Sequence, residues 1–432
     1  MVNTAKTYRF QVCFVILTRN RRERCLNCVN QAARALEGLS GKILVINNSA
    51  QQITTPEIAG TIPCKVIDMG KNMGVAARNI ALTESESEFL IMLDDDVLLE
   101  FVSPEGGADT RKTDNGRKLV GEILRIFQSD PKIGAVALTV YHNGSTESCL
   151  LPTVFHGCAC AFRTSALEKI GGYPSDFLYY GEEYSIAFRL YQSGYRIVMP
   201  LKTGVYHDRE GKNRNQGRII RLLMRNNAFL WVSSFPWHAL PGALKDTIRR
   251  YFFVARKEKA SLGFWRGFFS LPWAILRGIL QRNPLSDDIF QKIALIGPVE
   301  AICGKISSQK VIICGTGKFP SLWLKIFRKY GIEVKAFWDT NICWKGRKIC
   351  GVPVITEPDE WDDHGQDALF AVGLSSISET CHWKKHLQGI GLQPLSSIGK
   401  KRPEGEKNSK TGTFDLLSDT TPELYCAPRL NR

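Results

Sequence analysis

Three consecutive aspartates follow a run of apolar residues, and they are the strongest chemical signal in the chain. The run Phe89–Leu93 predicts a buried strand, and Asp94, Asp95 and Asp96 come directly after it. Side chains two positions apart on an extended chain point to the same side, so Asp94 and Asp96 can share a ligand while Asp95 points elsewhere. Hard divalent cations take oxygen ligands, so the pattern predicts a metal site. The alternative is a solvated acidic loop, which the apolar strand just before it disfavours.

Two further groups of residues are candidates for the same site. His207 follows the predicted strand Tyr195–Met199. A single histidine is more often structural, but a metal site needs further ligands, and imidazole is a common one. Glu182 and Glu183 open a predicted helix that runs to Ser193. Acids at a helix N-terminus are stabilised by the helix dipole, which is one explanation for the pair. The other is that one of these carboxylates is a general base.

Polar residues also follow the first two predicted strands. Thr18-Arg19-Asn20-Arg21 comes after the strand Gln11–Leu17, and Asn47-Asn48-Ser49 comes after the strand Lys42–Ile46. Open α/β sheets bind ligands at the carboxyl ends of their strands, so these residues are predicted to line one crevice. Arg19 or Arg21 can equally be a solvated surface cation.

The segment Asn72–Asn79, with the sequence NMGVAARN, is a weaker signal for ligand binding. Gly74 and the two alanines allow a helix to begin close to a ligand, and Arg78 can reach a phosphate. Small residues in such a segment can also serve close packing alone.

These residues need a scaffold in which strands alternate with helices. Helically spaced apolar residues predict a helix over Arg22–Leu36, and further runs predict a strand over Cys64–Met69 and a short helix over Val75–Leu82. The alternation implies βαβ units and a mostly parallel sheet, which is an α/β fold. A second α/β unit begins at Lys310. Its predicted strands are Val311–Cys314, Glu333–Trp338, Val352–Ile355 and Ala368–Val372, and its predicted helix is Ser321–Tyr330. The glycine turn Gly315-Thr316-Gly317 follows the first strand.

Length and composition fit a soluble globular protein of two or three domains. The chain has 432 residues, of which 44% are hydrophobic and 23% charged, which excludes a collagen and a multi-span membrane protein. The 57 Lys and Arg against 42 Asp and Glu give a net charge of +15, which suggests an anionic partner. The 13 cysteines are spaced irregularly, which is typical of a reduced cytosolic protein with buried thiols.

The stretch from Leu201 to Arg282 differs from the rest because cations and large aromatic residues are interleaved in it. It is predicted to be either a set of ordinary packing helices or a surface that lies on anionic lipid. We favour the anionic membrane surface. No run reaches the ~18 apolar residues that a spanning helix needs, and Met1–Phe10 lacks the apolar core of a leader. The positive charge concentrates here and no nucleic-acid-binding motif is found, so we expect no nucleic-acid partner.

Taken in order, these motifs resemble the family-2 glycosyltransferases, whose nucleotide-sugar-binding fold is called GT-A. The resemblance covers roughly Phe10 to Asp208. It is carried by Thr18–Arg21, Asn47–Ser49, Asn72–Asn79, Asp94–Asp96, His156–Arg163, Gly171–Tyr173, Glu182–Glu183 and His207. The chain looks closest to the rhamnosyltransferase-like bacterial branch that builds surface polysaccharides. The family usually has Asp as the base in an E-D pair, where this chain has Glu183, and the D-L that often follows is Ser185-Ile186 here.

The resemblance implies a metal-dependent glycosyltransferase that inverts the anomeric carbon. It would move a hexose or deoxyhexose from a nucleoside-diphosphate sugar to a hydroxyl of a glycan or polyprenyl-linked acceptor. It places Mn²⁺ or Mg²⁺ on Asp96, with Asp94 and His207 as further ligands, and makes Glu183 the base, with Glu182 beside it. The implied donor-binding residues are Thr18, Asn20, Arg21, Asn47, Asn72, Gly74, Arg78, Asn79, Asp94 and Asp95. The implied acceptor-binding residues are His156, Gly157 and Cys158.

We expect four parts along the chain. These are a GT-A domain over residues 1–230, a basic aromatic-rich helical segment over 231–300, a Rossmann-like domain over 305–400 and a mobile tail over 401–432. The Rossmann-like domain resembles the one that precedes sugar acyltransferases. Its glycine fingerprint lacks the third glycine, since Pro320 stands there, which favours a structural or assembly role over nucleotide binding.

Two other functions remain open from the sequence, a nucleotidyltransferase and a non-catalytic nucleotide-sugar-binding scaffold. The expected location is cytoplasmic, peripheral on the inner face of the cytoplasmic membrane. A homo-oligomer is a further option.

Overall fold

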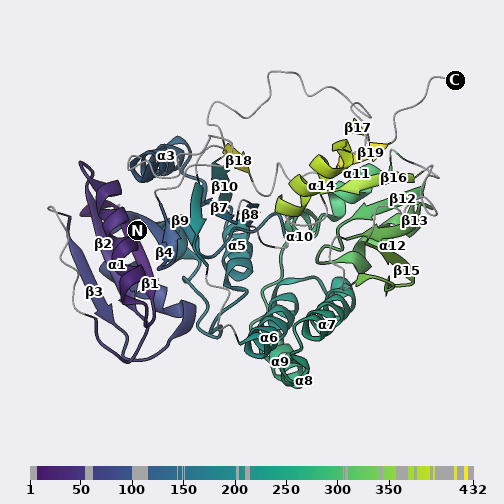
Figure 1. Ribbon diagram of the computed structural model, residues 1–432, viewed down its shortest axis with the longest axis horizontal. Helices are drawn as coiled ribbons and strands as arrows, with labels where there is room; N and C mark the ends of the chain where they lie inside the picture. The colour runs from purple at the N-terminus through teal and green to yellow at the C-terminus, as the bar shows by residue number, and fades with distance from the viewer. Residues whose placement is uncertain are drawn as a thin grey trace, which may run out of the picture. The chain divides into compact units, whose positions relative to one another are not determined.

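The computed structural model of the protein divides the chain into two compact units (Figure 1). The first unit comprises residues 1–147, 155–213 and 408–416, and the second comprises 148–154, 214–407 and 417–432. The structure describes residues 7–53, 62–99, 115–143, 145–147, 149, 151–200, 204–209, 215–304, 306, 310–339, 344–356, 368–373, 377–389, 393–394, 413–415 and 423–426. The predicted architecture, an α/β sheet followed by a helical segment and a smaller α/β domain, is confirmed.

The first unit is built from short alternating strands and helices. Its elements are β1 (Phe10–Thr18), α1 (Arg22–Leu36), β2 (Gly41–Asn47), β3 (Cys64–Asp68), the 3-10 helix η1 (Gly74–Ile80), α2 (Ala81–Glu84), β4 (Ser87–Asp94), β5 (Val97–Leu98), α3 (Asn115–Ser129), β6 (Ile133–Ala137), β7 (Thr139–His142), β8 (Ser145–Glu147), β9 (Ala159–Arg163), α4 (Thr164–Lys169), α5 (Glu182–Gln192), β10 (Arg196–Pro200), β11 (Gly204–His207) and β18 (Thr413–Asp415).

The main sheet of this unit has eight strands in the order β18-β10-β6-β9-β4-β1-β2-β3. The pairs β1/β2, β2/β3, β1/β4 and β6/β10 are parallel, as the alternation of strands and helices predicted. Strand β9 is antiparallel to both of its neighbours, which the sequence did not predict. This reversal sets the beginning of β9 at the carboxyl end of β4, where the Asp94 amide donates to the Cys158 carbonyl at 2.9 Å. The segment before β9 is thereby held next to the aspartates.

A second, smaller sheet has the strand order β5-β11-β7-β8. Strand β5 begins at Val97, one residue after the three aspartates, and it is antiparallel to β11. This sheet therefore brings the end of β11 to the carboxyl end of β4.

The core of the first unit explains why its strands are continuous apolar runs. In β1 the side chains of Val12, Phe14 and Ile16 are fully buried in one cluster with residues of α1 and α3. Burying each such side chain contributes roughly 1.5–3 kcal/mol. Helices α1 and α3 thus cover one face of the sheet, and the polar residues are left to the strand ends.

The second unit begins with helices and ends in a sheet. Its elements are α6 (Gln216–Ser234), the 3-10 helix η3 (Trp237–Ala239), α7 (Leu240–Lys257), α8 (Ser261–Phe268), α9 (Leu271–Leu280), α10 (Asp287–Ile293), α11 (Ile296–Cys303), β12 (Lys310–Cys314), α12 (Pro320–Lys329), β13 (Glu333–Trp338), β14 (Lys348–Ile349), β15 (Val352–Ile355), β16 (Ala368–Val372), α14 (Ile377–Gly389), β17 (Gln393–Pro394) and β19 (Glu423–Cys426).

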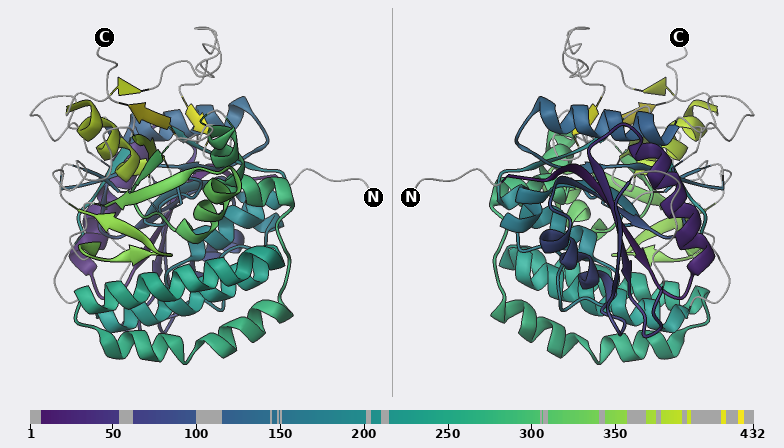
Figure 2. Two further views of the ribbon diagram at one scale, coloured as in Figure 1. Left: turned by 90° about the vertical axis from the view of Figure 1, so that its right-hand side faces the viewer. Right: turned by 90° about the vertical axis from the view of Figure 1, so that its left-hand side faces the viewer.

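The sheet of the second unit has the order β14-β15-β13-β12-β16-β19-β17 and is parallel from β15 to β16. Figure 2 shows α8 and α9 as the outermost helices of the unit's helical group, packed on α6 and far from the sheet. The predicted strands of this unit are all present within one residue of their expected bounds.

Three features of the chain bear on the predicted boundaries. The two units separate at Asn213 and Arg214, and α6 continues through residue 230, where the sequence suggested a boundary. Within the predicted tail, β18 pairs with β10 and β19 pairs with β16, and the other residues of the tail lie outside the described part. None of the cysteines whose side chains are described forms a disulfide, and most of them are buried. Among the described residues, no helix combines the length and apolar character that crossing a membrane requires.

Candidate active site

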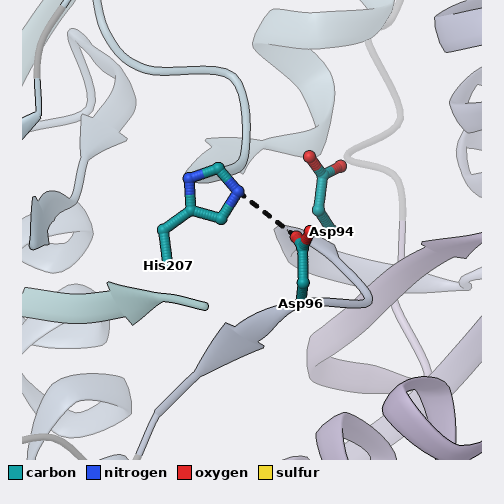
Figure 3. Close-up of side chains that lie close together, drawn as sticks. All are labelled: Asp94, Asp96 and His207. Carbon is teal, nitrogen blue, oxygen red and sulfur yellow. Dashed lines mark ion pairs between the residues drawn. The ribbon is translucent and has the colours of Figure 1, made fainter. Parts of the chain in front are cut away.

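Two carboxylates and one imidazole meet at the carboxyl end of β4 (Figure 3). Asp94, Asp96 and His207 each place a ligand atom within 4.8 Å of the others. The His207 Nε2 atom lies 3.3 Å from Asp96 Oδ1. The side chain of Asp94 is 40% exposed, whereas those of Asp96 and His207 are buried. Oxygen and imidazole ligands at this spacing fit Mn²⁺ or Mg²⁺, because two hard ligands and one borderline ligand suit such ions.

The small sheet positions His207 with respect to the aspartates. His207 is the last residue of β11 and pairs with Val97 of β5. One residue on, the Asp208 amide donates to the Asp96 carbonyl at 2.8 Å. This backbone pairing joins segments more than 100 positions apart and fixes the imidazole beside Asp96.

Glu147, at the end of β8, orients this imidazole. Its Oε2 atom lies 2.9 Å from His207 Nδ1, and its Oε1 atom is 3.0 Å from Arg209 Nη2. Metal-binding histidines generally use their second ring nitrogen in this way. Burial on its own lowers the pKa of His207, but hydrogen bonds to Asp96, Cys158 and Glu147 outweigh it and raise the pKa to about 12. Glu147 was not predicted, because it lies on a three-residue strand in a polar stretch.

Asp95 is outside the group of Asp94, Asp96 and His207 and contacts the turn after β1. Its Oδ2 atom accepts from Thr18 Oγ1 at 2.7 Å, and its Oδ1 atom accepts from Arg21 Nη1 at 3.0 Å. The same guanidinium donates to Asp96 Oδ2 at 2.9 Å. Burial raises the pKa of Asp95 to about 6, and the contacts with Thr18 and Arg21 offset only part of this effect. The turn after β1 is thereby tied to the aspartates, while Asn20 in it is exposed with φ of 58°.

Arg78 is buried beneath the site and supports it from within. Only 2% of its surface is exposed, and its Nη2 atom donates to Asp94 Oδ1 at 2.5 Å. Its Nη1 atom donates to the Gly157 carbonyl at 3.4 Å. In this arrangement Arg78 holds Asp94 and the segment before β9, and its predicted contact with a donor stays a prediction.

The other residues of the Asn72–Asn79 segment also have internal partners. Asn72 Oδ1 accepts from the Gly74 amide at 3.0 Å and from Tyr179 Oη at 2.9 Å. Gly74 has φ of 65°, and a Cβ atom there would lie 2.0 Å from the Leu178 carbonyl oxygen. Asn79 bonds both the amide and the carbonyl of Tyr173, at 2.7 and 2.9 Å. These contacts join the segment to the turn that leads into α5.

Asn47 lies at the end of β2, opposite Asp68 at the end of β3. Its amide nitrogen donates to Asp68 Oδ1 at 2.5 Å, and its Oδ1 atom accepts from Ser49 Oγ at 2.8 Å. Asp68 therefore lies with Asn47 at the strand ends, and its position at the end of a predicted strand could have identified it.

Glu183 faces the segment that precedes β9. A Cβ atom at residue 157 would lie 2.6 Å from Glu183 Oε1. The absence of a side chain at Gly157 therefore leaves room for the Glu183 carboxylate. The other oxygen accepts from the Gly181 amide at 3.2 Å, and the residue is half-buried. Glu182 is buried instead, and burial, together with the charge of Glu183, raises its pKa well above the ordinary value. The accessible carboxylate of the pair is therefore Glu183.

The predicted acceptor residues lie between Glu183 and the metal ligands. His156 Nε2 is 3.5 Å from Glu147 Oε2, and Cys158 is buried. Burial alone lowers the pKa of His156, but Cys158, Glu183 and Glu147 raise it to about 9. The candidate metal ligands, the carboxylate of Glu183 and the His156–Cys158 segment thus lie at one edge of the sheet.

Residues 13–171 match the family model described as Glycosyl transferase family 2. This part of the chain is a family 2 glycosyltransferase domain. The matched residues include Thr18, the three aspartates and the His156–Cys158 segment, and they end before Glu182, Glu183 and His207. A search of curated proteins finds no match.

Solved structures of glycosyltransferases are similar to this chain at low identity. A mannosyltransferase from Pyrobaculum calidifontis, in complex with GDP-Man and Mn²⁺, is 18% identical; the match covers 64% of this chain and 75% of that chain at a TM-score of 0.35. The S. aureus TarS 1–349 structure with UDP-GlcNAc is 13% identical and covers 66% of this chain and 86% of that chain at a TM-score of 0.42. GalNAc-T7 with UDP, GalNAc and Mn²⁺ is 12% identical and covers 62% and 56% at a TM-score of 0.40.

Proposed function

We propose that the protein is a metal-dependent, inverting glycosyltransferase that moves a sugar from a nucleoside-diphosphate sugar to a hydroxyl group. The observation that carries the proposal is the group of Asp94, Asp96 and His207 at the end of β4, whose two aspartates lie within the residues that match the family 2 model. Mn²⁺ or Mg²⁺ is the proposed cofactor, held by these three residues. When bound, the ion supplies positive charge that neutralises the departing diphosphate.

Glu183 is the proposed general base. It is half-buried, and its carboxylate contacts the Gly157 position in the proposed acceptor segment. A carboxylate there can accept the proton of the acceptor hydroxyl as its oxygen attacks the anomeric carbon. A single displacement of this kind inverts the anomeric configuration.

The other site residues are proposed to hold the donor and the metal ligands. Arg78 keeps Asp94 in place through the ion pair at 2.5 Å, and Glu147 fixes the ring of His207. The strand-end crevice with Thr18, Asn47 and Asp68 is the proposed place for the nucleotide, since ligands of open α/β sheets bind at that edge. Asn20, Arg21, Asn72, Gly74, Asn79 and Asp95 complete the proposed donor-binding set.

The proposed acceptor is a glycan or a polyprenyl-linked sugar of a surface polysaccharide, and the sugar moved is a hexose or deoxyhexose such as rhamnose. We extend the proposal to a cytoplasmic location, peripheral on the inner face of the cytoplasmic membrane. The net charge of +15 supports an anionic surface as partner.

A donor-hydrolysis screen tests the activity. The purified chain is incubated with a panel of nucleotide-sugars, each with Mn²⁺, with Mg²⁺ or with a chelator, and released nucleotides are separated by chromatography. We expect slow release of a nucleoside diphosphate from one donor, stopped by the chelator. Release of pyrophosphate in a parallel incubation with nucleoside triphosphates and sugar 1-phosphates would point to a nucleotidyltransferase instead. Tight binding of a donor with no turnover in the presence of sugar acceptors would point to a scaffold.

A further inference from the structure

Large apolar side chains are exposed on α8, on α9 and on the link between them. Of the twelve such side chains in the described part of the chain, eight lie between residues 262 and 280. Leu262 is 64% exposed, Phe269 75% and Leu280 69%. Monomeric soluble proteins rarely expose a contiguous apolar patch of this kind unless it binds something.

The two helices bury glycines and an alanine together with one large residue each, Phe264 and Leu271, and turn most of their large apolar residues outward. On α8 the buried positions include Gly263 and Gly267, and a Cβ atom at residue 263 would lie 2.4 Å from the Cα atom of Gly217 in α6. On α9 the buried positions are Leu271, Ala274 and Gly278. A Cβ atom at residue 278 would lie 2.8 Å from the Val232 Cβ atom.

This arrangement is the reverse of a surface helix in water, which buries its large apolar residues and exposes polar ones. Small residues at contacts between helices and large apolar residues facing outward are typical of helices whose outer face meets lipid. The exposed residues of α9 include Trp273, Leu276 and Ile279, and α8 adds Trp265 and Phe268.

Cations surround the apolar residues. Between residues 215 and 286 there are twelve Lys and Arg and two acids, Asp246 and Glu258. Arg256, Lys257 and Lys259 are exposed just before α8. Arg218 and Arg221 are exposed on the first turns of α6, against which α8 packs through its glycines.

The apolar surface continues from α8 onto α7. Phe264 of α8 and Phe252 of α7 line an apolar groove of about 520 Å³, with Lys245 and Arg249 among its lining residues. The ring centroids of Phe252 and Phe264 are 5.5 Å apart. Cations and apolar side chains therefore occur together on all three helices.

We propose that α8 and α9, which lie one after the other along α6, form an interfacial surface that lies in the headgroup region of an anionic bilayer. The apolar residues enter the boundary between headgroups and acyl chains, and the neighbouring cations contact anionic lipid. This role of α8 and α9 rests on the proposed membrane location and identifies the surface that would contact lipid. It does not depend on sugar transfer.

A second copy of the chain fits this surface less well than a bilayer. An isologous contact would bring the same cationic patch of each copy together, and like charges facing each other oppose association. An anionic bilayer offers both an apolar interior and the opposite charge.

Vesicle sedimentation with full-length protein tests the proposal. The apolar variant carries Leu262→Ser, Trp265→Ser, Phe269→Ser and Leu280→Ser. We expect its partition onto vesicles of phosphatidylcholine and phosphatidylglycerol to fall by more than about tenfold, at low and at high salt, because apolar burial is not screened. The cationic variant, Arg256→Gln with Lys257→Gln and Lys259→Gln, should lose about 10- to 100-fold at about 0.1 M salt and far less at high salt. Tyr330→Ser, at an exposed aromatic residue after α12, is the control and should bind like the parent.

A second measurement keeps the test valid if the apolar variant fails to fold. Trp265→Phe with Trp273→Phe preserves the apolar surface, so it should bind vesicles as the parent does. It should lose most of the tryptophan quenching by lipids with brominated acyl chains. Unchanged quenching, or unchanged binding by a folded apolar variant, would overturn the proposal. So would a dimer in sedimentation equilibrium that the apolar variant abolishes while vesicle binding persists. Donor hydrolysis without vesicles is measured in parallel, so that loss of the proposed activity is told apart from loss of lipid binding.

Discussion

Two strand ends in this chain carry turns that suggest a ligand, and they differ in how their charges are compensated. After β4, in the first unit, Asp94 keeps 40% of its side chain exposed beside the buried Asp96 and His207. After β12, in the second unit, a glycine turn leads into α12, where a Rossmann-like fold would place a phosphate.

The turn after β12 is closed by the protein's own carboxylates. Asp246 of α7 accepts from the Ser321 amide at the start of α12, at 3.0 Å, and from Arg249 Nη2 at 2.7 Å. Asp339 accepts from the Thr316 amide at 3.1 Å and from its hydroxyl at 2.8 Å. Arg250 also donates to the Gly317 carbonyl.

The two strand ends therefore differ in what their polar groups contact. In the second unit the helix N-terminus that would attract a phosphate holds Asp246, so the turn joins α7 to the sheet. In the first unit the exposed carboxylate of Asp94 is left facing solvent beside two buried ligand atoms. Although Arg78 pairs with Asp94, this carboxylate stays 40% exposed beside buried ligand atoms, which is the better sign of a ligand site.

The largest expected effect comes from removing a metal ligand. Asp96→Ala should lower donor turnover by more than about 10³-fold, because the diphosphate loses its neutralising ion while the fold persists. The measurement is release of nucleoside diphosphate across a Mn²⁺ titration. Thr316→Ala at the other strand end is the matched control and should leave turnover unchanged. Full activity of Asp96→Ala would remove the metal assignment.

The next effect concerns the proposed base. Glu183→Gln is nearly isosteric and removes only the capacity to accept a proton, so turnover with acceptor should fall by about 10²–10⁴-fold with donor binding intact. Donor affinity is followed by calorimetry and transfer by chromatography. If Glu182→Gln is the damaging change instead, the base is the buried residue and the assignment is wrong.

A third prediction addresses the closed turn. Asp246→Ala should lower the free energy of unfolding of the second unit by about 2–4 kcal/mol, because Arg249 and the start of α12 lose a buried partner. Urea unfolding measures the change. Asp246→Asn keeps a hydrogen-bond acceptor and should lose less. Donor hydrolysis should not change in either variant. Equal stability of Asp246→Ala and the parent would mean that the carboxylate does not hold the turn.

The sequence predicted most strands and the metal cluster for a local reason. Strand β4 and the aspartates are adjacent in the chain, and buried parallel strands are continuous apolar runs that are recognisable from sequence. Strand β4 ends at Asp94, and Asp95 and Asp96 form the turn after it, so the period of two along a strand does not determine the direction of their side chains.

The residues that the sequence did not predict act through contacts between distant segments. Glu147 orients His207 because β7, β8 and β11 pair, and nothing near residue 147 indicates that pairing. The contact of Arg78 with Asp94 was likewise not predicted, since the direction of a long side chain depends on tertiary packing, and the expected contact of Arg78 with a donor stays a prediction. The closure of the second glycine turn by Asp246 is equally non-local, since it depends on a residue 75 positions away.

The smallest expected effect is on the pH dependence of thermal stability, which should differ between variants of Glu182 and Glu183. Burial, and then the charge of Glu183, raise the pKa of Glu182 well above the value of 4.5 for the free side chain. The folded state therefore keeps the Glu182 proton longer than the unfolded chain does, and stability is lost as pH rises above 4.5 toward the raised folded pKa. Glu182→Gln cannot ionise, so its advantage over the parent should be near zero at about pH 5 and grow to about 2–4 °C in Tm by about pH 8. Thermal unfolding across that range, with Glu183→Gln as the half-buried comparison, measures the difference. A gain in Tm that is the same at every pH would show that packing, rather than ionisation of Glu182, is responsible.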